Sequence, residues 1–241
     1  MTTYPDKISF YNFVVEITRR CNMKCPHCLR GEAENKDLNI TAFDKLCQKT
    51  KYISSLTITG GEPSLNPDGI IDIINIMKKY NVGCGNFYVA TNGKNITEEF
   101  AIAMLKLYSF CDDNEVSQIE VSDDEFHDKD RHYELLKGLS SFSGKKECDY
   151  KKYGVLDIGR AKNIKNYKKS KIIRDQPILE DDFISEGLIT MTVDGDLLIG
   201  ICDYAFKDAK EISACNVNEE NWKNILCQKI NDGVYKNPYA I

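Results

Sequence analysis

The chain has 241 residues, 42% hydrophobic content and a formal net charge of −5, which together allow one large α/β core. No apolar run approaches the roughly 20 residues of a membrane-spanning helix, and the N-terminus lacks a basic patch followed by an apolar stretch. Ten cysteines without a secretion signal favour thiols or metal ligands over disulfides, so we expect a soluble cytoplasmic protein, with neither membrane nor nucleic acid as partner.

Short apolar, β-branched runs alternate along the chain with longer segments of helical periodicity. Six runs are candidate strands: 13–17, 56–59, 87–91, 119–122, 155–158 and 188–193. Apolar residues spaced by three and four predict helices over 41–52, 67–80, 96–108 and 129–139. This alternation predicts parallel strands joined by right-handed helical crossovers, and we expect a partial, TIM-like (β/α)6 barrel.

Local signals support several of these boundaries. Thr41 followed by Asp44 is a plausible helix N-cap, and Pro67 suits a first helical turn. Near the end of the chain, residues 193–197 contain Asp-Gly and read as a tight hairpin, followed by a last helix over 219–228. We therefore expect a core barrel over residues 8–186 and a last strand with a short cap over 187–241.

A cysteine loop follows the first predicted strand. Cys21, Cys25 and Cys28 form a C-x3-C-x2-C cluster. Three thiolates leave one iron of a cubane cluster open for an external ligand, whereas structural zinc requires a fourth protein ligand. The zinc alternative would need His27 or a distant cysteine, and His27 adjoins Cys28, a poor geometry for the same ion. Iron–sulfur is the favoured interpretation, and three unligated thiols the least favoured.

This loop resembles the cluster-binding signature of radical S-adenosylmethionine (SAM) enzymes. After the second strand, Thr59-Gly60-Gly61-Glu62-Pro63 is similar to the family's GGE motif, which binds the amino group of SAM. Paired glycines allow close backbone approach, and a Glu62 carboxylate can accept hydrogen bonds from an ammonium group. Taken alone, Gly-Gly-Glu-Pro would be an ordinary turn.

Two further strand ends continue the resemblance. The segment Thr91-Asn92-Gly93 is similar to a common family ending of the third strand, although Asn-Gly is also an ordinary turn. After the fourth strand, the resemblance implies that Ser122 and Asp123 contact the SAM ribose or carboxylate, with helix capping as the alternative. The cofactor-binding residues implied are His27, Gly60, Gly61, Glu62, Pro63, Asn92, Ser122 and Asp123. A lone histidine such as His127 is more often structural than catalytic.

The resemblance also implies the chemistry. A [4Fe–4S] cluster on the three loop cysteines would reductively cleave SAM to methionine and a 5′-deoxyadenosyl radical, which abstracts hydrogen from a substrate. Such a cluster needs an electron donor of the flavodoxin or ferredoxin type, and the enzyme should be sensitive to oxygen. Protein control then lies in positioning and in the charge and burial around the cluster.

The C-terminal third more loosely resembles peptide and protein maturases with a SPASM or twitch extension. Cys202, Cys215 and Cys227 are the local cysteines available for the auxiliary cluster of such an extension, and we favour a vestigial cap over a working cluster. Cys47, Cys84, Cys111 and Cys148 are read as small buried hydrophobes.

Three functions remain open from the sequence. The maturase resemblance implies a peptide or protein side chain as substrate, and a nucleotide or other small molecule is the enzymatic alternative. A non-catalytic, metal-stabilised binding protein is the third. Residues 145–174 carry eleven Lys or Arg against three acidic residues, a stretch that could attract phosphate or acidic peptide or simply form a solvated face.

Overall fold

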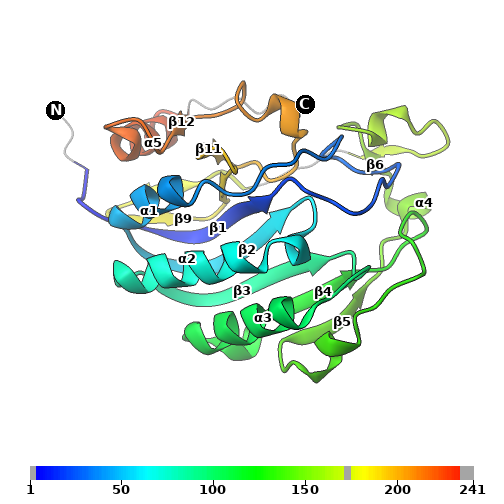
Figure 1. Cartoon of the computed structure of the whole chain (residues 1–241). Helices are drawn as coiled ribbons and strands as arrows, with labels where there is room; N and C mark the ends of the chain where they lie inside the picture. The colour runs from blue at the N-terminus through cyan, green and yellow to red at the C-terminus, as the bar shows by residue number, and fades with distance from the viewer. Residues whose placement is uncertain (1–3, 171–174, 234–241) are drawn as a thin grey trace.

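The computed structural model describes residues 4–170 and 175–233 of the chain (Figure 1). In these residues, a ten-stranded sheet has the main order β12-β11-β10-β1-β2-β3-β4-β5. Five consecutive parallel strands form its core: β1 (Ile8–Thr18), β2 (Thr50–Gly60), β3 (Gly83–Thr91), β4 (Gln118–Ser122) and β5 (Phe142–Lys146). The two ends of the sheet do not pair, so the expected partial TIM-like barrel is confirmed and remains open.

Three helices cover one face of the parallel strands (Figure 1). They are α1 (Ile40–Gln48), α2 (Pro67–Lys79) and α3 (Glu98–Phe110). Each begins with a side-chain cap: Asn39, Asn66 and Thr97 accept backbone N–H groups of the first turn. The first cap is therefore Asn39 and not Thr41, because its oxygen reaches Ala42 N at 3.2 Å.

The fifth strand differs from the expectation. Residues 155–158 were predicted to form it, but β6 (Val155–Leu156) pairs with β7 (Lys169–Ser170) in a separate two-stranded sheet. The strand beside β4 is β5, whose five residues have just one apolar side chain, Phe142. An edge strand with a solvent-exposed face and lysines carries little hydrophobic signal, which is why the pattern missed it.

The helix predicted over 129–139 is also largely wrong. The structure has a short 3-10 helix, η3 (Glu134–Gly138), and an irregular segment before it. In that segment His132 N donates to Gly93 O at 3.0 Å, and Ile96 N donates to His132 O at 3.0 Å. These long-range backbone bonds replace the local bonds that a helix would need.

The C-terminal residues extend the sheet beyond β1. Strand β10 (Ile189–Met191) is parallel to β1, and β11 (Asp196–Ile199) and β12 (Cys215–Asn216) continue antiparallel. Two shorter strands, β8 (Ile178–Glu180) and β9 (Phe183–Ser185), precede them, and β9 pairs with the start of β1. The hairpin predicted at 193–197 connects β10 and β11, and the predicted last helix is α5 (Trp222–Asn231).

The remaining short elements lie in connecting segments. They are η1 (Pro63–Leu65), η2 (Asn114–Val116), α4 (Tyr150–Tyr153), η4 (Ala161–Asn163) and η5 (Phe206–Asp208). Elements α4 and β6 lie at the end of the sheet toward which the parallel strands run (Figure 1). Loops at this end hold the candidate site, as expected for a parallel α/β barrel.

Candidate cluster and cofactor site

The cysteine loop leaves β1 and is held by backbone bonds from distant segments. Arg160 donates from its N–H to Cys28 O at 2.9 Å and from Nε to Cys25 O at 3.0 Å. Gly159 adopts φ +58°, and a Cβ there would lie 2.1 Å from Leu29 O. A glycine is needed at this close approach. Gly159 and Arg160 thus belong to the loop's support, a role the sequence analysis did not assign them.

Burial makes two of the loop thiols, Cys21 and Cys25, weaker acids in the chain without metal. It raises the pKa of Cys25 to about 11, with the neighbouring Cys21, Cys28 and Asp124 adding to the shift and Arg160 opposing it. Burial also raises the pKa of Cys21. A metal centre must displace these protons, since the thiolate is the ligand, so metal binding here releases protons.

Zinc and a cubane iron–sulfur cluster differ in the ligand set that each requires. Ligands on one zinc ion at about 2.3 Å bring sulfurs to within about 4.6 Å of each other at most. Among the described residues, just one set of three His, Cys, Asp or Glu ligand atoms lies within 4.8 Å, and it contains none of the loop cysteines. The loop cysteines do not form such a set, and their three sulfur donors suit an iron–sulfur cluster with one iron left open.

The glycine pair after β2 fixes the start of the cysteine loop. Gly61 N donates to Thr18 O at 2.7 Å and Glu62 N donates to Arg20 O at 2.8 Å. A Cβ at Gly60 would lie 2.1 Å from Thr18 O, and one at Gly61 would lie 2.2 Å from Arg20 O. The glycines are thus required because the backbone of the cysteine loop lies directly against them. The sequence had suggested close approach of a ligand instead.

The Glu62 residue is 1% exposed, and its carboxylate accepts hydrogen bonds from other residues of the chain. Its Oε1 accepts from Thr91 Oγ1 at 2.5 Å and Ser64 N at 3.0 Å, and its Oε2 accepts from Asn92 N at 2.7 Å. Pro63 follows as the first residue of η1. Glu62 therefore joins the ends of β2 and β3, and further hydrogen-bonding capacity remains chiefly at Oε2.

Asn92 connects β3 to the cysteine loop. Its Nδ2 donates to Asn22 Oδ1 at 2.8 Å, and its Oδ1 accepts from Lys94 N at 2.9 Å. A surface cavity of about 320 Å³ opens beside Cys25, with Asn22, Lys94 and His127 among its lining residues. This volume lies within the range of small-molecule sites.

The Ser122 carbonyl and the Asp123 carboxylate contact cationic side chains. Arg131 donates to Ser122 O at 2.7 Å and to Asp123 Oδ1 at 3.0 Å, while Lys129 and Lys145 each reach the Asp123 carboxylate at 2.8 Å. Hydrogen bonds from the two lysines hold the pKa of Asp123 well below its usual range. The structure thus gives the Asp123 carboxylate three cationic partners before any ligand is considered.

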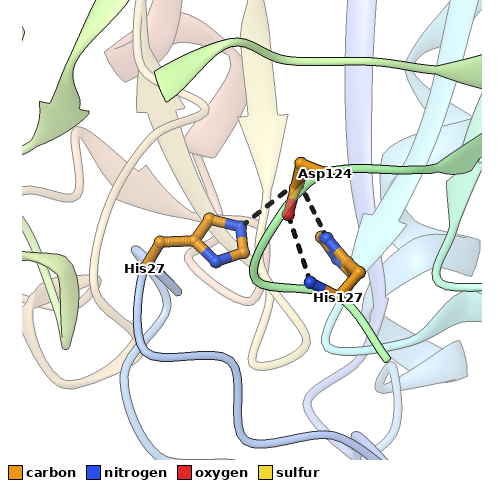
Figure 2. Close-up of side chains that lie close together, drawn as sticks. All are labelled: His27, Asp124 and His127. Atoms are coloured by element: carbon orange, nitrogen blue, oxygen red, sulfur yellow. Dashed lines mark hydrogen bonds and ion pairs between the residues drawn. The ribbon is translucent and has the colours of Figure 1, made fainter. Parts of the chain in front are cut away.

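Asp124, which the sequence analysis did not single out, is the residue that meets the cysteine loop. Its carboxylate lies 2.8 Å from His127 Nδ1 and 3.8 Å from His27 Nε2, as Figure 2 shows. The backbone N–H groups of Phe126 and His127 donate to Oδ1 at 2.9 and 3.2 Å. Asp124 lies two residues beyond the end of β4, so strand alternation did not predict its direction.

His27 belongs to this group and stacks on Phe126, with ring centroids 4.7 Å apart. Burial lowers the pKa of His27 to about 4, so its imidazole is neutral at pH 7. His27, Asp124 and His127 together could hold one metal ion, because their ligand atoms lie within 4.8 Å of one another. The two backbone N–H groups that donate to Oδ1 also hold the Asp124 carboxylate in place without an ion.

The cap cysteines do not gather into a further ligand set in the described residues. Cys215 and Cys227 are buried near each other, and burial raises the pKa of Cys215 to about 12. Cys202 lies instead next to Asp203, which its thiol contacts at 3.2 Å. Cys47, Cys84 and Cys111 are buried as predicted, and Cys148 is half-buried.

The fold and the loop define a class of protein: an open parallel α/β barrel with a three-cysteine loop directly after its first strand. The sequence model of the Radical SAM superfamily matches residues 15–141, just over half of the chain. The chain therefore belongs to the radical SAM superfamily, whose enzymes use a [4Fe–4S] cluster and SAM.

Individual relatives match a smaller part. A stretch of 95 residues is 30% identical to an uncharacterized protein of Methanocaldococcus jannaschii, covering 37% of this chain and 33% of that protein. Another of 92 residues is 29% identical to GTP 3′,8-cyclase of Rhizobium etli, covering 34% of this chain and 26% of the cyclase. The matches thus span about a third or less of these relatives.

Among solved structures, native anSMEcpe with bound AdoMet and the Kp18Cys peptide is similar, with a TM-score of 0.58 and 13% identity. The same enzyme with the Cp18Cys peptide gives a TM-score of 0.55, and both matches cover 97% of this chain and 84% of that one. At this identity the likeness establishes the fold. In the described residues, no helix is long and apolar enough to cross a membrane.

Proposed function

We propose that this chain holds a [4Fe–4S] cluster on Cys21, Cys25 and Cys28 and uses it to cleave SAM reductively, acting on a peptide or protein side chain. The bound cluster and SAM supply a 5′-deoxyadenosyl radical for hydrogen abstraction. The observation that carries the proposal is the three-thiol loop after β1, joined by backbone bonds to Gly61 and Glu62.

The chain's own residues would prepare the site in two ways. The glycine pair and the Glu62 carboxylate fix the ends of β2 and β3 against the loop, so the thiols need little rearrangement on binding. The cavity beside Cys25 provides room for SAM or substrate, with His127 on its wall. His27, Asn92, Ser122 and Asp123 remain proposed contacts of the cofactor.

Two observations bear on the substrate. Exposed lysines at 151, 152, 162, 165 and 168 lie in the segment that supports the cysteine loop through Arg160, so an acidic peptide would find positive charge near the site. The similar fold of anSMEcpe, solved with bound peptides, agrees with this choice. The match to GTP 3′,8-cyclase favours the second candidate, a nucleotide, whose phosphates would suit the same lysines.

Residues 187–241 are proposed to act as a cap without an auxiliary cluster. A flavodoxin or ferredoxin is proposed as the electron donor. The third interpretation, a non-catalytic binding protein, is set aside by the superfamily membership.

Anaerobic reconstitution tests the proposal. With iron, sulfide, SAM and dithionite, we expect about four irons per chain and formation of 5′-deoxyadenosine. Cys25→Ala should remain folded but lose cluster absorbance and SAM cleavage, whereas Cys148→Ala, a half-buried cysteine outside the loop, should retain both. Tight zinc with no SAM cleavage would overturn the proposal. Stimulation of 5′-deoxyadenosine formation by GTP but not by acidic peptides would favour the nucleotide.

A further inference from the structure

A buried polar network lies behind the cysteine loop and contains residues from both ends of the chain. Glu16, Arg19, Arg30 and Tyr204 are 0, 4, 9 and 0% exposed. Arg19 Nε donates to Glu16 Oε1 at 2.5 Å, and the Tyr204 hydroxyl donates to Glu16 Oε2. One carboxylate on β1 is thus shared between the start of the cysteine loop and the C-terminal cap.

Arg30 makes the corresponding connection at the other end of the loop. Its Nη1 donates to Tyr204 O at 3.3 Å, and its guanidinium lies 4.2 Å from the centroid of the Tyr204 ring. Phe206 N donates to Arg30 O at 3.0 Å, and the Phe206 ring lies 4.9 Å from the Arg19 guanidinium. The cap segment 201–209 therefore contacts both flanks of the loop.

The charges in this network make its contacts interdependent. A buried guanidinium is costly unless hydrogen bonds, opposite charge or aromatic faces compensate it. Arg19 has Glu16 and also Glu34, whose Oε2 lies 3.0 Å from Nη1. Arg30 has the Tyr204 carbonyl and ring and, in addition, the charges of Glu16 and Asp203. If the cap segment moved away, Arg30 would lose compensation while Glu16 would lose a hydrogen-bond donor.

Arg19 lies two residues before Cys21, and Arg30 lies two residues after Cys28. We infer that Tyr204 and Arg30 are positioning residues, through which the cap fixes both flanks of the cysteine loop before the cluster binds. This inference rests on the proposed cluster site. The inference gives the cap a function that needs no auxiliary cluster, because the cap orders the three thiols that hold the proposed [4Fe–4S] cluster.

Tyr204→Phe is the sharpest variant, because it removes the hydroxyl bound to Glu16 and keeps the ring beneath Arg30. Tyr88→Phe is the matched control, since Tyr88 also donates to a glutamate, Glu120, at 2.6 Å. Hydrogen–deuterium exchange of residues 19–31 in the metal-free chain is the first readout. We expect roughly ten- to hundredfold faster exchange in Tyr204→Phe, as for loss of one charge-assisted hydrogen bond, and no change in Tyr88→Phe.

A second pair of variants separates positioning from general stability. Arg30→Met should lose iron to a chelator faster than the wild type and change the electron paramagnetic resonance signal of the reduced cluster with SAM. Arg30→Lys should partly restore both. Unchanged loop exchange in Tyr204→Phe, or equal acceleration over the whole chain, would overturn the inference. A wild-type chain that binds no cluster would instead refute the proposed function, while the metal-free exchange experiment still decides the role of Tyr204.

Discussion

Two adjacent aspartates after β4, Asp123 and Asp124, have different partners and therefore different roles. Asp123 faces Lys129, Arg131 and Lys145, whereas Asp124 faces His27 and His127. Burial opposes ionisation of Asp124, but hydrogen bonds from His127 and the Phe126 N–H still hold its pKa below the usual value. Asp124 is therefore ionised beside the proposed cluster, and Asp123 anchors the segment that follows β4.

The ion pairs of Asp123 predict a pH-dependent contribution to stability. Because its pKa is lower in the folded chain, its stabilisation is present above the unfolded value near pH 4 and is lost as pH falls through the folded value. Asp123→Asn should lower the free energy of unfolding at pH 7 by about 1 kcal/mol, since exposed Lys129 and Lys145 are screened by solvent. Urea unfolding of the metal-free chain should show this difference shrinking by pH 3.

A different result would support a contact between the Asp123 carboxylate and SAM. If Asp123→Asn weakens SAM binding to the reconstituted protein and leaves the pH dependence of unfolding unchanged, the carboxylate contacts SAM and the ion pairs contribute little. Calorimetric titration of SAM into both proteins measures this directly.

At the scale of elements, the ends of β1, β2 and β3 form one connected unit. Gly60 and Gly61 bring β2 against the chain leaving β1, and Glu62 joins β2 to Thr91 and Asn92 of the third strand end. The unit explains why the motif needs two glycines and a carboxylate in that order. The residues that resemble a cofactor-binding motif also hold the cysteine loop in place.

Gly61→Ala tests this unit. Its new methyl group would lie 2.2 Å from Arg20 O, so the backbone must shift, at a cost of about 1 to 3 kcal/mol. We expect lower stability in urea and lower iron retention. Gly138→Ala is the control, because nothing lies within 4 Å of its added Cβ. Equal behaviour of the two variants would show that the close approach is not required.

At the scale of the whole molecule, cap and barrel share one sheet and the main apolar core. Strand β10 pairs with β1, and the main apolar cluster includes Trp222 and Leu226 of α5 together with Phe13 and Phe43. The cap also has a small apolar cluster of its own around Tyr204 and Phe206, but its strand β10 and helix α5 bury their apolar side chains in the main cluster. Cap and barrel should therefore unfold as one cooperative unit.

The single tryptophan reports on this cooperativity. Trp222 lies in the cap and is 4% exposed, so its fluorescence follows the cap, while far-UV circular dichroism follows the whole chain. The two urea transitions of the metal-free chain should coincide in midpoint and slope. An earlier fluorescence transition would show instead that residues 187–241 unfold independently.

The sequence by itself determined the features that depend on local spacing. The thiols of the cysteine loop, the glycine pair, the first four parallel strands and the Asp-Gly hairpin all follow from residue types a few positions apart, and the barrel class follows from their alternation. Asp124 was not within reach of the same reasoning, because it lies beyond the end of β4, where strand alternation no longer applies.

The tertiary structure alone decided which distant groups meet. The edge strand β5 lacks an apolar pattern, and its place is set by pairing with β4. Tyr204 and Glu16 are 188 residues apart, and Gly159 meets the cysteine loop from another segment of the chain. Such contacts depend on the path of the whole chain, because burial of the shared core brings these segments together and no local spacing encodes the partner of a buried charge.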